Sequence, residues 1–532
     1  MVAAGILLSR LVGLVRQKLF AHFLGNGLEA AAFAAATRIP NVLQNLLGEG
    51  VLSASLIPVY AGLRAKKDEA EARRVAGAVF GLLALMVGVL VAVGLLAAPL
   101  LVSLIAPGFE GAQRELTITL VRIIFPGTGV LVLSAWCLGI LNSHKRFFLS
   151  YAAPVVWNGC IIGALISSRG ENQDQIVTWA AWGTVAGSIA QFVVQLPSVI
   201  RLLGGLNAKP SMQSPAVKEV VSGFLPAVMA RGVVQVSSWV DTAYASLISE
   251  RAVSALSYAQ TIALLPVSLF GMAISAAELP EMSADAIKSK EERAAAIRDR
   301  LSAGLQRMAF FVAPSAIAFL FLGDLISATL LESGKFTAAD SRFTWYLLIG
   351  SGVALSAQTS GRLYSSAFYA LKDTRTPLKF AAIRVSLGIA FGYYAVHILP
   401  GQLGLPAHLG AVFITITTGL TAWLERTLLA RALQREIGVL SSTWSASAKV
   451  WGAAFVAGAI TLGVKVWLGT KYGTVEAVTS EWGGSMFAPV ALPRIPVSLG
   501  LLGVFCALYG IACLVLKVPQ ANAVLRRVLR RK

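Results

Sequence analysis

Arginine side chains lie inside long apolar stretches of this chain, where a charge is costly unless water, a partner or a ligand solvates it. The first stretch contains Arg10 and Arg16, and the second contains Arg38. Two later stretches contain Arg231 and Arg362. A guanidinium presents N–H donors in a planar fork that suits phosphate or diphosphate oxygens. We therefore interpret these five residues as candidate ligands for an anionic, phosphate-bearing substrate.

Smaller polar side chains accompany the arginines on the same helical faces. At 3.6 residues per turn, one arc of about 120° in the first stretch holds Ser9, Arg10, Gly13, Arg16 and Gln17. The second stretch, a helix that we expect to start or kink near Pro40, has a stripe of Arg38, Asn41, Gln44, Asn45, Gly48, Glu49 and Ser55. Further stripes hold Arg231, Gln235, Ser238 and Asp241, then Ser254, Ser257, Gln260 and Thr261. Each stripe is predicted to face a polar cavity.

Structural roles for the same charges stay open as alternatives. Arg10 and Arg16 could snorkel to an interface or form ion pairs, although snorkelling would not require Ser9 on the same arc. Glu49 is the natural partner of either arginine, in a structural pair or in gating. Asp241 is assigned to gating or ion pairing as well. Arg362 could simply cap the cytoplasmic end of its helix.

The elements that position these residues are membrane-spanning helices. The chain has 532 residues, 56% of them hydrophobic and only 13% charged, with a mean hydropathy of +0.72. A helix needs about 20 apolar residues to cross about 30 Å of hydrocarbon. We expect an all-α polytopic membrane protein with about 14 such helices. The predicted spans are 3–24, 29–61, 76–101, 117–141, 150–167, 176–198, 219–248, 252–280, 306–323, 342–370, 377–398, 408–430, 447–468 and 496–516.

Basic residues gather in every second gap between these stretches. The gap after the second stretch holds Arg64, Lys66, Lys67, Arg73 and Arg74, whereas the next gap holds only Arg114. By the positive-inside rule the basic gaps and both termini are predicted to be cytoplasmic. The net charge of +19 lies in short loops without interleaved aromatic residues, so anionic lipid is the expected counter-charge and nucleic acid is not.

No pattern indicates covalent chemistry. The four histidines are scattered, and no HExxH, P-loop or GxSxG arrangement occurs. The four cysteines lie in apolar runs without a CxxC pair, as expected for packing residues. We therefore predict a protein that is not an enzyme and that has no metal or cofactor.

The predicted organisation has two pseudo-repeated halves. Residues 1–200 form an N-terminal six-helix lobe, 201–218 a cytoplasmic linker, and 219–435 a C-terminal six-helix lobe around a central cavity. Residues 436–532 add helices 13 and 14, joined by an external loop at 469–495, and a basic cytoplasmic tail.

Several motifs resemble one known family in order along nearly the whole chain. They include the segment from Ser9 to Arg16, Arg38-Ile-Pro40-Asn41, Asp241-Thr-Ala-Tyr, Gly334-Lys-Phe-Thr337 and the run from Phe368 to Pro377. Together they resemble the MurJ (MviN) family, the lipid II flippases of bacterial cell-wall synthesis. The resemblance implies the multidrug/oligosaccharidyl-lipid/polysaccharide exporter fold, alternating access, a groove for the lipid tail at helices 13 and 14, and functional roles for Arg10, Arg16 and Glu49.

The chain departs from the family pattern where charges are usual. Gln17 and Ala31 replace acidic residues, Gln44-Asn45 replaces an Arg-Arg pair, and Gln260-Thr261 replaces Asp-Arg. Asp241 resembles part of a sodium site in some relatives, but span 11 supplies Arg384 and no carboxylate or Asn. Sodium or proton coupling is therefore an open alternative that the sequence does not favour.

The resemblance implies a cargo, partners and a location. The expected cargo is lipid II, an undecaprenyl-diphosphate glycan, carried across the bacterial inner membrane, with membrane lipids and cell-wall synthesis proteins as further partners. Two alternatives stay open: an exporter of another polyprenyl-diphosphate glycan, and a membrane scaffold that does not transport.

Overall fold

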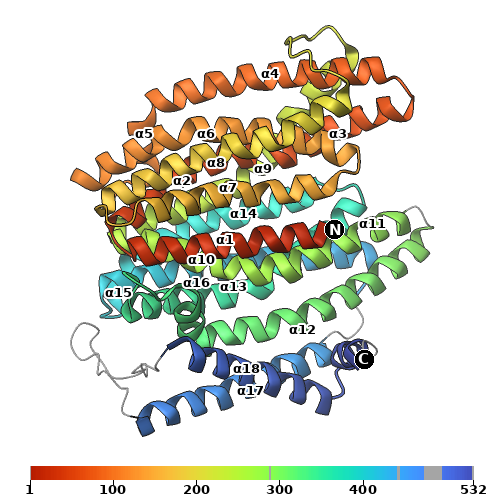
Figure 1. The fold of residues 1–532 in the computed structure, drawn as a ribbon. Helices are drawn as coiled ribbons and strands as arrows, with labels where there is room; N and C mark the ends of the chain where they lie inside the picture. The colour runs from red at the N-terminus through yellow and green to blue at the C-terminus, as the bar shows by residue number, and fades with distance from the viewer. Residues whose placement is uncertain (1, 287–288, 440–443, 473–493, 530–532) are drawn as a thin grey trace. The chain divides into compact units, whose positions relative to one another are not determined.

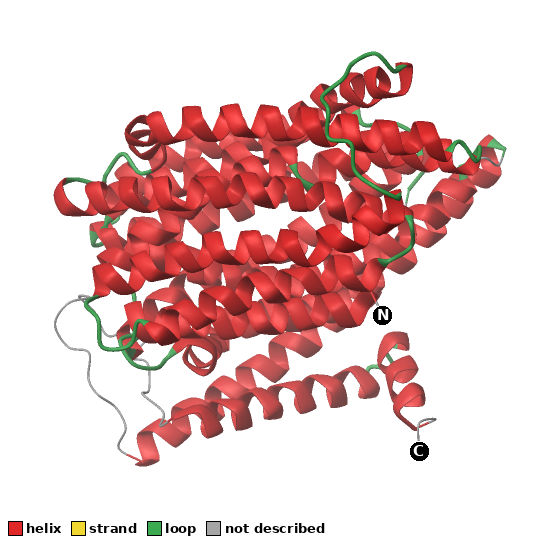
Figure 2. Cartoon of the chain, turned by 45° about the horizontal axis from the view of Figure 1, so that its top comes forward, coloured by secondary structure: helices red, strands yellow, loops and turns green. Residues whose placement is uncertain are grey.

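The computed structural model of the chain describes residues 2–286, 289–439, 444–472 and 494–529. Helices make up nearly all of these residues, as the all-α prediction requires (Figure 2). The external loop predicted at 469–495 falls almost wholly outside the described residues. The described helices divide into two compact units, Met1–Ser254 with Ser333–Phe336, and Ala255–Glu332 with Thr337–Lys532. Each unit is described on its own below.

Unit 1 is a bundle of nine helices that continues into the start of a tenth, and Figure 1 labels them along the chain. Their bounds are α1 (Val2–Leu24), α2 (Leu28–Leu47), α3 (Glu49–Ala65), α4 (Glu69–Leu96), α5 (Ala98–Ile105), α6 (Gly111–Ser143), α7 (Phe147–Ser167), α8 (Gln173–Leu203), α9 (Pro215–Ile248) and α10 (Glu250–Pro266). One apolar core joins α3, α4, α6 and α8 around the fully buried Trp136 and Tyr60. A second joins α1, α2, α5, α6, α7 and α8.

Unit 2 contains the remaining helices, including two short π segments. Their bounds are η1 (Val267–Met272), α11 (Ala273–Asp285), α12 (Lys290–Leu331), α13 (Ala338–Ala370), α14 (Arg375–Tyr393), η2 (Tyr394–Ile398), α15 (Leu399–Gln402), η3 (Ala407–Leu409), α16 (Gly410–Ile437), α17 (Trp444–Tyr472), α18 (Arg494–Val515) and α19 (Pro519–Leu529). One core joins α11, α12, α13 and α16. Another packs α17, α18 and α19 against α12 (Figure 1).

A helix covers each of the fourteen predicted spans, although not always without a break. Ten helical segments in the described part are long and apolar enough to cross a membrane. The other four predicted spans correspond to α1, α2 with α3, α9 and α13. These four carry the predicted polar stripes or arginines, and such residues lower the hydropathy of a segment while leaving it helical.

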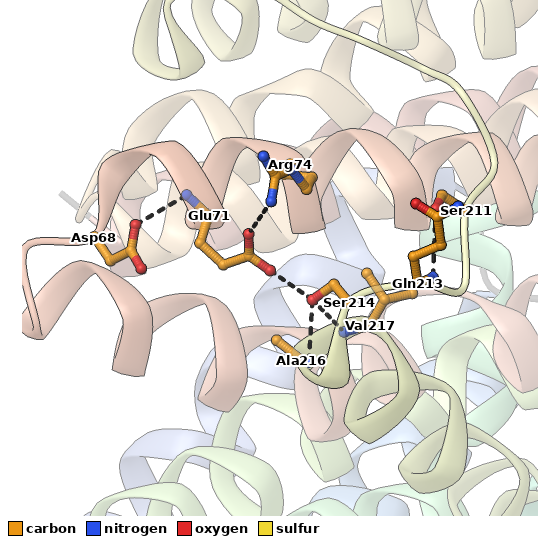
Figure 3. Close-up of polar contacts among 8 residues, drawn as sticks. All are labelled: Asp68, Glu71, Arg74, Ser211, Gln213, Ser214, Ala216 and Val217. Carbon is orange, nitrogen blue, oxygen red and sulfur yellow. Dashed lines mark hydrogen bonds and ion pairs between the residues drawn. The ribbon is translucent and has the colours of Figure 1, made fainter.

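The segment predicted as a linker is ordered against α4. The backbone of 204–214 lies so close to this helix that a Cβ on Gly77 would come within 2.1 Å of the Asn207 carbonyl oxygen. A Cβ on Gly81 would come within 2.2 Å of the Ala208 carbonyl oxygen. Ser214 begins α9 by accepting the amide N–H groups of the next turn, and its hydroxyl donates to Glu71 of α4 (Figure 3). The linker is therefore fixed to unit 1.

The compact units divide at Ser254, whereas the sequence predicts a division within 201–218. The difference arises because α9 packs along α3 and α2 of unit 1. The two lobes and the central cavity between them stay a prediction. The cysteines are free, with Cys137 and Cys513 buried as expected and Cys506 exposed.

Candidate substrate-binding site

The polar stripe of α1 faces away from the most exposed side of this helix. Leu8, Leu11 and Val15 are the exposed residues, and their spacing of three or four puts them on one side. The predicted site residues Ser9, Arg10 and Arg16 are only partly exposed. In a lipid-crossing helix the exposed leucine and valine side suits acyl chains, so the arginines lie on the side that suits protein or polar groups.

Arg16 lies against the aromatic ring of a neighbouring helix. Its guanidinium carbon is 4.9 Å from the ring centroid of Trp157 on α7. The Arg16 Nε is buried and has no hydrogen-bond partner among the described residues. A guanidinium held over a ring face keeps the orientation of its fork while its N–H groups stay available. Sequence analysis did not identify Trp157, because its contact with Arg16 joins two different helices and leaves no pattern along either one.

The stripes of α2 and α9 meet side by side. Arg38 of α2 lies close enough to Asp241 of α9 for their charges to attract. The Asn45 side-chain amide donates to Gln235 Oε1 at 3.3 Å. The structure thus brings together Arg38, Asn45 and Asp241 from the predicted site. The proximity of Arg38 fits the ion pairing that the sequence allowed for Asp241, and its roles in ion pairing and in gating stay predictions.

The helix of the second stretch is interrupted within its predicted polar stripe, between α2 and α3. Pro40 lies inside α2, and the helix ends instead at Gly48, whose N–H still donates to the Gln44 carbonyl oxygen at 2.8 Å. A Cβ on Gly48 would lie 2.2 Å from that same oxygen. Only glycine fits there without a shift of the backbone. Of the predicted start or kink near Pro40, the start is wrong, because the chain is already helical from Leu28, and the kink stays a prediction.

Two predicted charged residues cannot be placed. The side chains of Glu49 and Arg231 lie outside the described residues, so the proposed pairing of Glu49 with Arg10 or Arg16 stays a prediction. Asn41 is exposed and Gln44 is half-buried. Among the described residues, no group of three or more His, Cys, Asp or Glu is arranged to hold a metal ion.

In unit 2, Arg362 belongs to a charged cluster built from three helices. Arg384 Nε of α14 lies 3.1 Å from Glu425 Oε2 of α16, and their side chains are 17% and 19% exposed. Arg362 of α13 is close enough to interact electrostatically with both. The cluster lies well before the end of α13, so the structure does not support Arg362 as a terminal cap. Its neighbours place it in a polar cluster instead.

The predicted pair Gln260 and Thr261 lies on α10. Both are half-buried, and the Thr261 hydroxyl donates to the Ser257 carbonyl oxygen at 2.9 Å. Such a bond to the preceding helical turn is a common way to satisfy a threonine hydroxyl in an apolar environment. A role for these two residues in binding cargo stays a prediction.

Sequence analysis missed a buried ion pair in unit 2. Lys465 of α17 pairs with Asp324 of α12, and their side chains are only 4% and 10% exposed. The ammonium also lies 5.0 Å from the ring centroid of Trp345 on α13. A lysine within an apolar run of 447–468 was the available signal, because such a charge needs a partner inside the protein.

Comparison with known proteins decides the family. The family model described as "Lipid II flippase MurJ" matches residues 20–480. The Lipid II flippase MurJ of Burkholderia cenocepacia is 30% identical over 511 residues, which is 94% of each chain. This chain belongs to the MurJ family.

Further relatives agree with this family assignment and with the fold. A probable lipid II flippase MurJ of Rhizobium meliloti is 31% identical over 391 residues, covering 72% of both chains. A solved structure titled "Lipid II flippase MurJ, inward closed conformation" matches with a TM-score of 0.75 at 22% identity, over 97% of this chain and 98% of that one. An inward-facing multidrug resistance MATE family transporter of the MOP superfamily matches with a TM-score of 0.65 at 17% identity, over 82% of this chain and 96% of that one. The structural likenesses confirm the predicted fold class of an all-α multi-pass membrane protein, and the relative agrees with the predicted family.

Proposed function

We propose that this MurJ family member is a lipid II flippase, which moves lipid II from the cytoplasmic to the outer leaflet of a bacterial inner membrane by alternating access. The observation that carries the proposal is the family match over residues 20–480, together with 30% identity to a Lipid II flippase MurJ over 94% of the chain. The charge pattern of the loops supports cytoplasmic termini.

The geometry of unit 1 supports an arginine-based site for the diphosphate. Arg16 is oriented by Trp157 and keeps an unused buried N–H group. Arg38 is held near Asp241, which offsets part of the cost of its charge in an apolar layer. Arg10 lies on the same side of α1 as Arg16. In this proposal the diphosphate oxygens accept from Arg10 and Arg16, while Arg38 exchanges between Asp241 and the cargo.

The proposed transport uses no covalent chemistry and no cofactor. It is also independent of sodium, because a carboxylate neutralised by a nearby guanidinium is a poor ligand for a hard cation. Asp241 is in that position beside Arg38. Replacing sodium by potassium should leave the rate of lipid II translocation unchanged. A rate that falls several-fold in potassium would contradict this part of the proposal.

The function is tested by replacement in a bacterial host depleted of its own lipid II flippase. The chain should restore growth and the amount of lipid II that an outer-leaflet probe can reach. A chain that is inserted at normal levels and restores neither refutes the proposal. Restored export of a different polyprenyl-diphosphate glycan, with no effect on lipid II, would establish the alternative cargo.

A further inference from the structure

Two guanidinium groups in unit 2, those of Arg362 and Arg384, lie near a single carboxylate, that of Glu425. Arg362, Arg384 and Arg426 come from α13, α14 and α16, and Glu425 is next to Arg426 on α16. The two positive charges of Arg362 and Arg384 and the negative charge of Glu425 leave a net charge of +1 for this cluster. Charge of this size in an apolar layer is stable only with further anions or water nearby.

All of these residues lie at a similar depth from one end of the helices. Arg362 lies eight residues before the end of α13 at Ala370, and Arg384 lies nine residues after the start of α14 at Arg375. At a rise of 1.5 Å per residue both are about 12–14 Å inside that end. Glu425 lies twelve residues before the end of α16 at Ile437, or about 18 Å by the same rise. The connection between α13 and α14 carries Lys372, followed by Arg375 and Lys379 at the start of α14, and is predicted to be cytoplasmic.

The internal ion pair leaves donor capacity unused. Arg384 Nε lies 3.1 Å from Glu425 Oε2 but is buried without an aligned hydrogen-bond partner among the described residues. Their charges attract, yet this N–H group does not point at the carboxylate. A ligand oxygen placed in line with it would gain a charge-assisted hydrogen bond.

Arg426 has a different role from the other two arginines. Its Nε donates to the Ser360 hydroxyl at 2.9 Å, and its guanidinium carbon is 4.9 Å from the ring centroid of Trp423. It also lies 5.8 Å from the ring centroid of Tyr364. These contacts fix Arg426 between α13 and α16. Arg362 and Arg384 are thus the two arginines best placed to bind a ligand.

We propose that Arg362 and Arg384 form a second anion site, in unit 2, for a phosphate-bearing group that enters from the cytoplasmic end, and that Glu425 is the internal anion it displaces. Two arginines from neighbouring helices can donate bidentate hydrogen bonds to the oxygens of a diphosphate. The phosphate source is either the diphosphate of the cargo, which rests on the proposed function, or the headgroup of an anionic phospholipid. Glu425 weakens binding because the ligand must compete with it for Arg384.

Equilibrium binding of inorganic diphosphate to the full chain in phosphatidylcholine nanodiscs tests the site. Arg10 and Arg16 are replaced by Gln throughout, so that unit 1 contributes little to the signal. In this background Arg384→Gln and Arg362→Gln should each weaken binding about tenfold or more. Glu425→Gln should tighten binding about tenfold, since the competing anion is removed. Arg375→Gln, an exposed arginine at the start of α14, is the matched control and should not change the affinity.

A variant that unfolds is recognised by size-exclusion chromatography. The double variant Arg384→Gln/Glu425→Gln removes one positive and one negative charge together, so it should fold but not bind diphosphate. Equal affinity for diphosphate in all variants overturns the proposal. Adding phosphatidylglycerol to the nanodiscs separates the sources: competition with diphosphate identifies a lipid headgroup, and no competition identifies the cargo diphosphate. The binding measurement does not depend on translocation. A chain that binds diphosphate at this site but does not flip lipid II would therefore refute the proposed function and leave the second anion site standing.

Discussion

Removing Lys465 should destabilise the chain far more than removing any exposed lysine. Lys465 and Asp324 are 4% and 10% exposed, so both charges are held away from water. Asp324 Oδ1 has no hydrogen-bond partner among the described residues, and Lys465 is the partner of the other carboxylate oxygen. Lys465→Met therefore leaves a buried carboxylate without compensation. Breaking a buried ion pair in this way costs about 3–5 kcal/mol.

The prediction is measured as the free energy of unfolding in mixed micelles, with the helix signal as readout. Lys465→Met should lower this free energy by about 3–5 kcal/mol. The double variant Lys465→Met/Asp324→Leu should recover most of the loss, because replacing both charges by apolar groups is often neutral or stabilising. Lys449→Met, at an exposed position of the same helix α17, should change stability by no more than about 0.5 kcal/mol.

The double variant decides whether the reasoning is right. If the loss arises from an unpaired charge, the two changes are strongly non-additive. A double variant as unstable as the sum of the single variants would show that the loss comes from packing around Trp345 instead. If the free energy of unfolding of Lys465→Met lies within about 1 kcal/mol of the wild-type value, the ion pair does not stabilise the packing of α17 against α12.

Three further predictions follow from unit 1 and from the loop before α14. Gly77→Val should expel the linker from α4, because the added Cβ meets the Asn207 carbonyl, and proteolysis at 204–214 should become faster; unchanged cleavage would contradict this. Arg38→Gln should abolish most lipid II translocation and leave Asp241 without its neighbouring positive charge. The double variant Arg38→Gln/Asp241→Asn should fold normally but still not transport. Full transport by either variant would contradict a role for Arg38 in binding. Asp373 accepts the N–H groups of the first turn of α14, and these bonds hold the pKa of its carboxyl below the usual value. Because the folded pKa is depressed, its stabilising effect is present above the unfolded pKa of about 3.9 and is lost as pH falls through the folded pKa. Asp373→Ala should therefore cost about 1 kcal/mol at pH 7 and less at pH 3, as unfolding measurements at the two pH values would show.

The sequence predicted the helices because each span needs an apolar run whose length is set by the membrane. It also predicted which side of α1 is polar, since Arg10 and Arg16 share an arc that excludes Leu8, Leu11 and Val15. These features depend on one helix at a time. The spacing of residues along a single helix is enough to find them.

Pairs between helices could not be predicted in the same way. The meeting of Arg38 with Asp241, and of Arg384 with Glu425, depends on which helices are neighbours and at what height. The sequence analysis noted that span 11 has Arg384 and no carboxylate, but it did not identify Glu425 on α16 as the partner of this arginine. The break at Gly48 was not predicted either, because Pro40, where a helix start or kink was expected, is the stronger helix breaker by residue type. The Thr37 hydroxyl donates to the Phe33 and Ala34 carbonyl oxygens just before that proline, and α2 continues through it.

The most direct test of the central proposal is translocation of fluorescent lipid II by the purified chain in proteoliposomes. The wild-type chain should move fluorescent lipid II, without ATP, from the outer leaflet of the liposome to the inner leaflet, where an added quencher cannot reach it. Arg16→Gln should insert normally, bind lipid II more weakly and lose most of this activity. Lipid II translocation that is equal in empty liposomes and in liposomes with the chain, or equal for the wild type and Arg16→Gln, would contradict the account.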